Sequence, residues 1–246
     1  MHEAAYRALG EDWRYQLLPV PPQLLAETLG ALPAAGFDGV NVTIPHKQAA
    51  LALADDASPA AREIGAANTL SFSDGAVHAA NTDAPGLLAA LPGPVRGARA
   101  VVLGAGGSAR ATVWALRSAG AHDVLVWNRT PERARTLCAQ VGGRAVAKID
   151  GGADLLVNCT AVGLRASDDP WRDLPLVADG MGGFGCVVDL AYGDGETDLI
   201  AAARRAGATA VEGLEVLVRQ GGLSLELWTG RPAPLAQMRA AARGAA

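Results

Sequence analysis

The stretch Ala98-Arg99-Ala100-Val101-Val102-Leu103-Gly104-Ala105-Gly106-Gly107-Ser108-Ala109 joins a short apolar run to a glycine-rich turn. The run predicts a buried strand, and the residues after the turn predict a helix as far as Ala119. Gly104, Gly106 and Ala109 fit the G-x-G-x-x-G/A pattern, whose glycines allow a tight turn and close approach to a pyrophosphate. The helix start adds free N–H groups and a positive dipole end. The stretch therefore predicts a Rossmann-type dinucleotide-binding domain, with a glycine-rich turn that binds nothing as the alternative.

The end of the next expected strand, Asp123–Trp127, indicates which dinucleotide is bound. An NAD site usually has Asp or Glu there to hold the ribose 2′-hydroxyl. This chain instead has Asn128-Arg129-Thr130, with Arg133 one helical turn further on. Guanidinium groups beside a helix start suit a 2′-phosphate, so we expect NADP. Ordinary surface arginines are the alternative interpretation.

Strand and helix patterns alternate along the chain, which predicts α/β architecture with parallel sheets. Expected strands are Trp13–Val20, Gly39–Ile44, Asn68–Phe72, Ala76–Ala80, Ala98–Leu103, Asp123–Trp127, Asp154–Cys159, Cys186–Leu190 and Thr209–Val211. Ser73-Asp74-Gly75 indicates a hairpin turn. Pro92-Gly93-Pro94 marks a change of composition and is the expected linker. Two helices, near Leu214–Trp228 and Pro234–Ala242, follow the last strand.

The composition excludes several classes of protein. The 246 residues are 50% apolar and 19% charged, which is typical of a folded chain. A net charge of −4 provides no electrostatic surface for nucleic acid, and the apolar runs are too short to span a bilayer. No signal-peptide pattern is present, and Cys138, Cys159 and Cys186 show no spacing for a disulfide framework or metal site. We therefore expect a soluble protein of a reducing compartment, which is typical of the cytoplasm.

A polar cluster, Asn41-Val42-Thr43-Ile44-Pro45-His46-Lys47, follows another expected strand. Ligands of open α/β sheets bind at such carboxyl ends of strands. Of 21 basic residues only Lys47 and Lys148 are lysines. Reduction of a carbonyl creates negative charge on its oxygen, so a nearby cation is required. Lys47 is the candidate cation and Asp83 its candidate partner, with a solvated helix residue as the alternative for Lys47.

Motifs along the whole chain resemble, in order, those of the shikimate dehydrogenases. They are Asn41–Lys47, Gly65–Leu70, Asn81–Asp83, Gly104–Ala109, Asn128–Thr130, Asn158–Thr160, Asp189–Tyr192 and Gly213–Gln220. The resemblance implies two α/β domains with the site in the cleft between them. It places a substrate-binding catalytic domain at residues 1–84 plus 220–246, to which the C-terminal helices return. A Rossmann-type NADP-binding domain then spans residues 85–219.

The same resemblance implies an activity and a set of site residues. The activity is reversible, NADP-linked reduction of 3-dehydroshikimate to shikimate, a step toward chorismate and the aromatic amino acids. Lys47 and Asp83 are implied as the catalytic pair, and Thr43, Asn68, Tyr192 and Gln220 as substrate-binding residues. Cofactor binding is implied for Gly104, Gly106, Gly107, Ser108, Ala109, Asn128, Arg129, Thr130, Arg133 and Gly213. No metal is expected, and the sequence is compatible with a monomer or a homodimer.

The chain departs from the family pattern at its first residues. The family normally begins with a β-strand and a Ser-x-Ser-Pro turn that binds the substrate carboxylate, whereas Met1-His2-Glu3 resembles the helix after that turn. We expect an upstream start to restore the segment, because its absence leaves backbone groups unpaired and an apolar groove open to water. The alternative functions are a quinate- or aminoshikimate-type dehydrogenase and a truncated NADP-binding protein without activity.

Overall fold

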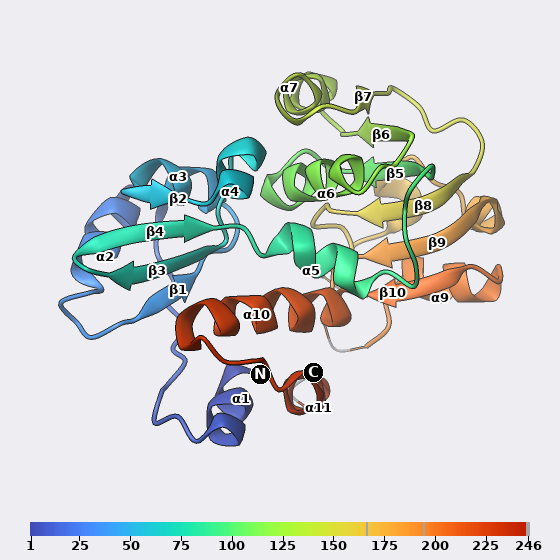
Figure 1. Ribbon diagram of the computed structural model, residues 1–246. Helices are drawn as coiled ribbons and strands as arrows, with labels where there is room; N and C mark the ends of the chain where they lie inside the picture. Colours follow the sequence, from blue (N-terminus) through green and yellow to red (C-terminus); the bar gives the residue numbers. More distant parts are fainter. Residues whose placement is uncertain (166, 194, 245–246) are drawn as a thin grey trace. The chain divides into compact units, whose positions relative to one another are not determined.

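The structure, a computed structural model, describes residues 1–165, 167–193 and 195–244 (Figure 1). The chain forms two compact units. Among the described residues, the first unit contains Met1–Gly86 and residues 218–244, and the second contains Leu87–Leu217. The chain passes from one unit to the other within two helices, α5 (Asp83–Ala90) and α10 (Gly213–Thr229). The linker predicted at Pro92-Gly93-Pro94 is therefore wrong, because those residues follow α5 inside the second unit.

The first unit is built on a mixed four-stranded sheet with the order β1-β3-β4-β2. Its strands are β1 (Gly39–Asn41), β2 (Asp56–Ala57), β3 (Thr69–Ser73) and β4 (Ala76–Ala80). The pairs β1–β3 and β3–β4 are antiparallel, and β2 pairs with β4 in parallel. Asp74 and Gly75 have φ of 52° and 75° in the hairpin turn, as the predicted Asp-Gly turn requires.

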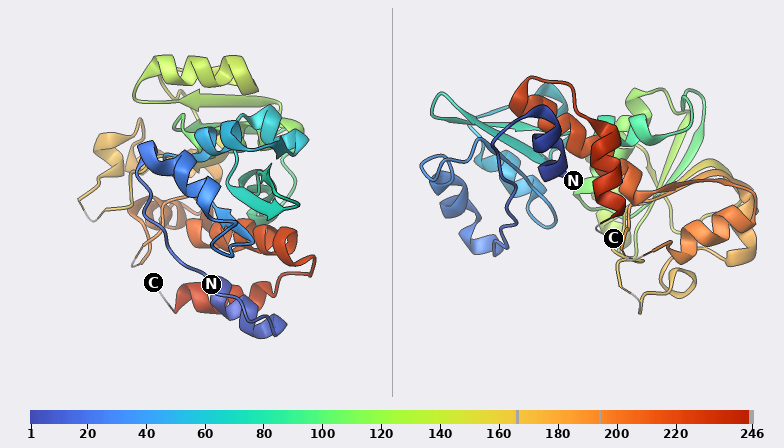
Figure 2. Two further views of the ribbon diagram at one scale, coloured as in Figure 1. Left: turned by 90° about the vertical axis from the view of Figure 1, so that its left-hand side faces the viewer. Right: turned by 90° about the horizontal axis from the view of Figure 1, so that it is seen from below.

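Several helices complete the first unit. They are α1 (His2–Leu9), η1 (Pro22–Leu24), α2 (Leu25–Ala31), α3 (Lys47–Leu53), α4 (Pro59–Ile64), the start of α5, most of α10, and α11 (Leu235–Arg243). Leu25 and Leu29 of α2 pack with Leu70 of β3 in the core. Helices α1 and α11, from opposite ends of the chain, lie side by side (Figures 1 and 2).

The strand predicted at Trp13–Val20 is wrong, because this segment has no regular secondary structure. Its aromatic side chains pack onto α1 instead of marking one face of a strand. The Trp13 ring meets Tyr6 edge-on at 5.7 Å, and the Tyr15 ring stacks on His2 at 4.4 Å. Pro19, Pro21 and Pro22 also lack the N–H groups that a strand donates to its neighbour.

An apolar groove lies along β1 in the first unit. Among the described strands β1 pairs with β3 alone. A cavity of about 720 Å³ is lined by residues 12–20, by Leu25 and Leu29 of α2, and by residues 35–43. No helix in the described part of the chain is long and apolar enough to cross a membrane.

The second unit contains a six-stranded, all-parallel sheet with the order β10-β9-β8-β5-β6-β7. The strands are β5 (Arg99–Leu103), β6 (Asp123–Trp127), β7 (Arg144–Ala145), β8 (Ala153–Asn158), β9 (Phe184–Asp189) and β10 (Thr209–Glu212). The chain runs outward from β5 to β7 and then returns to the other side of β5 at β8. Such a reversal of strand order is where doubly wound sheets bind their ligands.

Both faces of the second sheet are buried, which explains the apolar runs of its strands. Ala100 and Val102 of β5 face one core, whereas Val101 and Leu103 face the other. Helices α6 (Gly107–Ser118) and α7 (Pro131–Val141) contribute to the first core, and α9 (Asp198–Arg205) contributes to the second. Two short elements, α8 (Pro170–Asp173) and η2 (Ala178–Gly183), complete the unit. The sheet confirms the predicted Rossmann-type fold.

Candidate active site

Lys47 and Asp83 form an ion pair in the first unit. Lys47 is the first residue of α3, and Asp83 is the first residue of α5. The Lys47 Nζ atom lies 2.6 Å from Asp83 Oδ2, and the two side chains are 14% and 18% exposed. The start of a helix favours a carboxylate and disfavours an ammonium. Asp83 therefore suits its position, whereas Lys47 depends on the carboxylate that faces it.

Asn68 holds the second oxygen of the same carboxylate. Its amide nitrogen Nδ2 lies 3.0 Å from Asp83 Oδ1, while its amide oxygen accepts the Thr82 backbone N–H at 2.7 Å. A backbone N–H can only donate, so this contact determines which way the Asn68 amide faces. Asn68 is only 3% exposed. The Asp83 carboxylate is consequently bound at both oxygens, by an ammonium on one and an amide on the other.

The predicted substrate-binding residues differ in their relation to this pair. Gln220 of α10 belongs to the group, because its Oε1 atom lies 3.0 Å from Asn68 Nδ2. Thr43 lies just after β1, where its exposed hydroxyl donates to the Ile44 carbonyl at 3.4 Å. Tyr192 belongs to the second unit and is described with it below.

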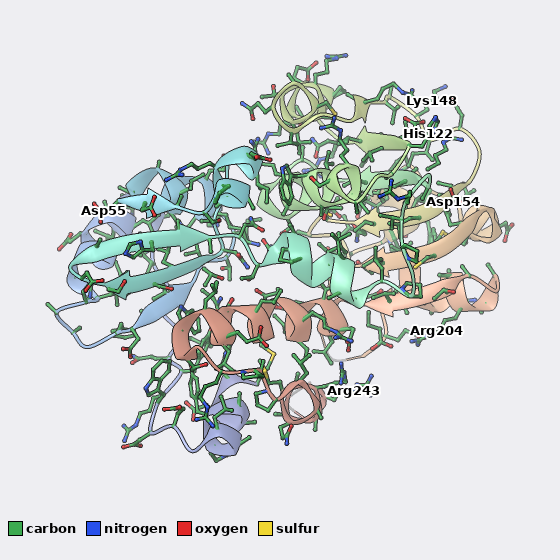
Figure 3. The ribbon with its side chains drawn as sticks, in the orientation of Figure 1. Asp55, His122, Lys148, Asp154, Arg204 and Arg243 are labelled. Atoms are coloured by element: carbon green, nitrogen blue, oxygen red, sulfur yellow. The ribbon has the colours of Figure 1, made fainter. Side chains whose placement is uncertain are left out.

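The chain's other lysine is in a different setting. Lys148 lies exposed after β7 in the second unit, where Figure 3 shows it at the outer edge of that unit. His46 also has a local role, since its Nε2 atom lies 2.8 Å from the Val20 carbonyl. Lys47 is thus the lysine that sits within a group of polar side chains.

Sequence reasoning missed part of the polar group in the first unit. Ser224 lies one helical turn after Gln220 in α10, and its hydroxyl is 2.7 Å from that of Thr69 and 3.1 Å from that of Thr82. Asn41 Nδ2 donates to Ser224 Oγ at 2.8 Å. The available sequence signal was a serine one helical turn after Gln220 in the mostly apolar segment Gly213–Thr229.

The glycine-rich turn of the second unit has the backbone that a dinucleotide needs. Gly104 has a φ of 107°, and a Cβ at this position would lie 3.1 Å from the Cys159 carbonyl oxygen. Gly106 caps α6 without a side chain, so the N-terminal N–H groups of that helix face no capping oxygen from Gly106. A Cβ at Gly106 would meet no atom within 4 Å. These features fit the binding of a pyrophosphate at the helix start.

The predicted 2′-phosphate residues follow β6. Asn128 Nδ2 donates to the Thr130 carbonyl at 2.9 Å and shapes the turn into α7. Thr130 is the residue before α7, although its side chain makes no capping hydrogen bond. Arg129 and Arg133 are both exposed at this helix start. Two guanidinium groups beside a helix N-terminus fit a dianionic phosphate.

A buried carboxylate organises the neighbouring strand ends of the second unit. Asp189 is 1% exposed and accepts hydrogen bonds from Asn158 Nδ2 at 2.8 Å, Thr197 Oγ1 at 2.6 Å and the Ala191 N–H at 3.1 Å. Burial raises the pKa of the Asp189 carboxyl, and the hydrogen bonds oppose that rise. This network connects the end of β8 to the loop after β9.

Two further predicted residues lie on or against that loop. Tyr192 is 46% exposed, and the burial of its ring raises the pKa of its hydroxyl. A Cβ at Gly213 would lie 2.8 Å from the carbonyl oxygens of Asp189 and Ala191. Gly213 therefore allows the start of α10 to approach the loop closely, and a larger residue would displace the backbone.

Family models match three parts of the chain. The model described as "Shikimate dehydrogenase substrate binding domain" matches residues 1–70, and "Shikimate / quinate 5-dehydrogenase" matches residues 88–162. The model described as "Shikimate 5'-dehydrogenase C-terminal domain" matches residues 213–243. A curated relative from Methanothermobacter thermautotrophicus, "Shikimate dehydrogenase (NADP(+))", is 44% identical over 251 residues, covering 96% of this chain and 87% of the relative.

Solved structures with the same fold include two with different names. A shikimate 5-dehydrogenase from Thermus thermophilus, in complex with NADP(H) and shikimate, superimposes with a TM-score of 0.90 at 41% identity, covering 100% of this chain and 93% of that one. A ligand-free 5-ketofructose reductase of Gluconobacter sp. strain CHM43 has a TM-score of 0.88 at 32% identity, covering 99% and 92%.

Proposed function

The chain belongs to the shikimate dehydrogenase family, and we propose that Lys47 and Asp83 are its catalytic pair. The protein is an NADP-dependent oxidoreductase that acts on a CH–OH group. Its reaction is the reversible reduction of 3-dehydroshikimate to shikimate in the shikimate pathway. NADPH, when bound, supplies the hydride.

Lys47 acts on the oxygen of the reacting carbonyl. Reduction leaves negative charge on that oxygen, and the Lys47 ammonium stabilises the charge and donates the proton. In the direction of shikimate oxidation the amine takes the proton back. Asp83, at 2.6 Å, holds the ammonium at the start of α3, where the helix dipole alone would disfavour it.

Polar groups around the pair recognise the substrate's hydroxyl and carboxylate groups. Asn68 and Gln220 stand beside Asp83, so they are placed to bind hydroxyl groups next to the reacting carbon. Thr43 and Tyr192 are the remaining candidates for substrate binding. Each offers a hydroxyl that is exposed in its own unit.

The second unit holds NADP. Gly104, Gly106, Gly107, Ser108 and Ala109 bind the pyrophosphate with backbone N–H groups at the start of α6. Asn128, Arg129, Thr130 and Arg133 form the 2′-phosphate site, and Gly213 makes a backbone contact with the cofactor. The expectations of a cytoplasmic enzyme that binds no nucleic acid, as a monomer or homodimer, stay predictions.

The observation that carries the catalytic assignment is the 2.6 Å contact between Lys47 and Asp83. The test is shikimate-dependent NADPH formation by Lys47→Ala, with Lys148→Ala as the matched control because Lys148 is the chain's other lysine. Loss of the general acid should lower kcat about 10²- to 10⁴-fold, whereas the control should match the wild type. Wild-type turnover by Lys47→Ala would rule out the assignment.

Substrate choice is a separate question, because one matching family model names quinate beside shikimate. Comparing kcat/KM for shikimate, quinate and an amino analogue of shikimate tests it directly. We expect shikimate to be preferred, and a higher kcat/KM for quinate or the amino analogue would move this chain to another branch of the family.

A further inference from the structure

Three hydroxyl groups form a buried cluster beneath the catalytic pair. Thr69 and Ser224 are 0% exposed and Thr82 is 3% exposed. The Thr69 and Ser224 oxygens are 2.7 Å apart, and the Thr82 oxygen lies 3.1 Å from each of them. Each hydroxyl therefore has two hydroxyl neighbours within hydrogen-bond distance.

The cluster is connected to the Asn68 amide on both sides of that group. Asn68 Nδ2 donates to Thr82 Oγ1 at 2.9 Å, and Asn68 Oδ1 accepts from Thr69 Oγ1 at 3.4 Å. The same Nδ2 atom donates to Asp83 Oδ1 at 3.0 Å. Any rotation of the amide would break contacts to the cluster and to the carboxylate together.

Helix α10 anchors the cluster from a distant part of the sequence. Ser224 donates to the Gln220 carbonyl at 3.1 Å, and Asn41 Nδ2 donates to Ser224 Oγ at 2.8 Å. Asn41 Oδ1 in turn accepts from the Tyr15 hydroxyl at 3.0 Å. Buried polar networks that are satisfied in this way resist rearrangement, because each broken hydrogen bond leaves an unpaired group.

A close helix contact holds α10 at the required distance. A Cβ at Gly86 would lie 2.8 Å from the Gln220 backbone nitrogen, so α5 and α10 approach each other almost backbone to backbone. Gly86 lies one turn after Asp83 in α5. The cluster is thus next to the helix start that presents the catalytic carboxylate.

We propose that Thr69, Thr82 and Ser224 are positioning residues for the reaction, which hold the Asn68 amide so that it orients the Asp83 carboxylate toward Lys47. This inference rests on the proposed catalytic pair. Thr69 and Thr82 contact the Asn68 amide directly, and Ser224 supports both of them. The competing interpretation is that the cluster only joins α10 to the sheet.

Thr69 offers a matched pair of substitutions. Thr69→Val keeps the side-chain shape and removes the hydroxyl, whereas Thr69→Ser keeps the hydroxyl and removes a methyl group. Positioning predicts that Thr69→Val lowers kcat about tenfold with little change in the KM for NADP, because misplacement of reacting groups reduces turnover steeply. Thr69→Ser should keep at least half of the wild-type kcat.

Two results would overturn the proposal. One is wild-type kcat in a folded Thr69→Val protein, and the other is a larger loss in Thr69→Ser than in Thr69→Val, which packing alone predicts. If Thr69→Val fails to fold, Ser224→Ala decides in its place, since a kcat equal to the wild type would exclude positioning. Circular dichroism and thermal unfolding establish folding for each variant.

Lys47→Ala, measured in the same series, separates this inference from the proposed function. If Lys47→Ala is inactive and Thr69→Val is fully active, the positioning proposal fails and the catalytic pair stands. If Lys47→Ala is fully active, the catalytic pair itself fails, and the positioning proposal fails with it.

Discussion

The glycine-rich turn of the second unit and the Lys47–Asp83 pair of the first unit, the proposed cofactor and catalytic sites, are built by different means. The turn takes its shape from the backbone of consecutive residues, Gly104–Ala109. Within it, Gly104 has a φ of 107°, a conformation that residues with a side chain rarely adopt. The Lys47–Asp83 pair takes its geometry from side chains of α3 and α5, and Asn68 connects Asp83 to Gln220 of α10. A backbone site should therefore depend on glycine, whereas a side-chain site should depend on single functional groups.

Replacement of the Asp83 carboxylate by an amide should have the largest effect on kcat. Asp83→Asn keeps the size of the side chain but removes the charge that holds the Lys47 ammonium. We expect kcat to fall about 10²- to 10³-fold, the range for loss of one electrostatic partner in an active site. NADP affinity, measured by fluorescence titration, should stay at the wild-type value because the second unit is unchanged. A comparable loss of NADP affinity would contradict the separation of the two sites.

Removal of both arginines of the proposed 2′-phosphate site should weaken NADP binding and leave kcat nearly unchanged. The double variant Arg129→Ala/Arg133→Ala is expected to raise the KM for NADP at least about 100-fold, because each hydrogen bond to a charged group contributes about 1.5–3 kcal/mol and two such contacts are lost. The kcat at saturating NADP should change little. Arg135→Ala is the matched control, since Arg135 is exposed on the same helix and pairs with Glu132. If the ratio of the KM for NAD to the KM for NADP is the same as in the wild type, the assignment of these arginines to the 2′-phosphate is wrong.

One buried titratable group in each unit should change the free energy of unfolding with pH, and the two changes should have opposite signs. Burial, together with the charge of the chain's amino group, lowers the pKa of His2 in the first unit to about 4. Between pH 6.5 and 4 the unfolded chain then binds a proton that the folded chain does not, so stability falls as the pH falls. The loss should reach about 2 kcal/mol at about pH 5. Burial of the Asp189 carboxyl in the second unit has the opposite sign, because the folded state there favours the protonated form.

His2→Phe tests this prediction. The variant removes the titrating group and also the His2 Nδ1 atom, which is buried and has no hydrogen-bond partner among the described residues. Unfolding free energies measured from about pH 7 to about pH 5 should fall less steeply in His2→Phe than in the wild type. Equal slopes would show that His2 does not contribute to acid sensitivity.

A single methyl group in the glycine-rich turn should have the smallest effect, and it separates strain from ligand contact. Gly104→Ala should lower the free energy of unfolding by about 1–2 kcal/mol, because alanine is strained at positive φ and its Cβ crowds the Cys159 carbonyl. Gly106→Ala has open space and should change stability by less than about 0.5 kcal/mol, while it weakens NADP binding. Thermal unfolding with and without NADP measures both effects. Equal destabilisation by the two variants would contradict the separate roles of Gly104, which avoids strain, and Gly106, which leaves space for the ligand.

The second sheet could be predicted from sequence more fully than the first. Its main strands are buried on both faces, so each appears as an apolar run, and the predicted strand Asp123–Trp127 coincides with β6. The strands β2 and β7 were missed because each pairs over only two residues, too few to show a periodic pattern. In Trp13–Val20 the aromatic pattern came from packing on α1, which a local pattern cannot distinguish from one face of a strand.

The sequence by itself determined the glycine-rich turn after β5, the arginines that follow β6 and the identity of the lysine at the start of α3. These features depend on residues close together in the chain, so backbone conformation and helix starts already imply their chemistry. Only the tertiary structure decided that Asn68 binds Asp83, that Gln220 joins them and that Ser224 closes a hydroxyl cluster below. Hydrogen bonds act over about 3 Å, and more than a hundred residues of chain separate Ser224 from its threonine partners, so only the packing of α10 brings these groups together.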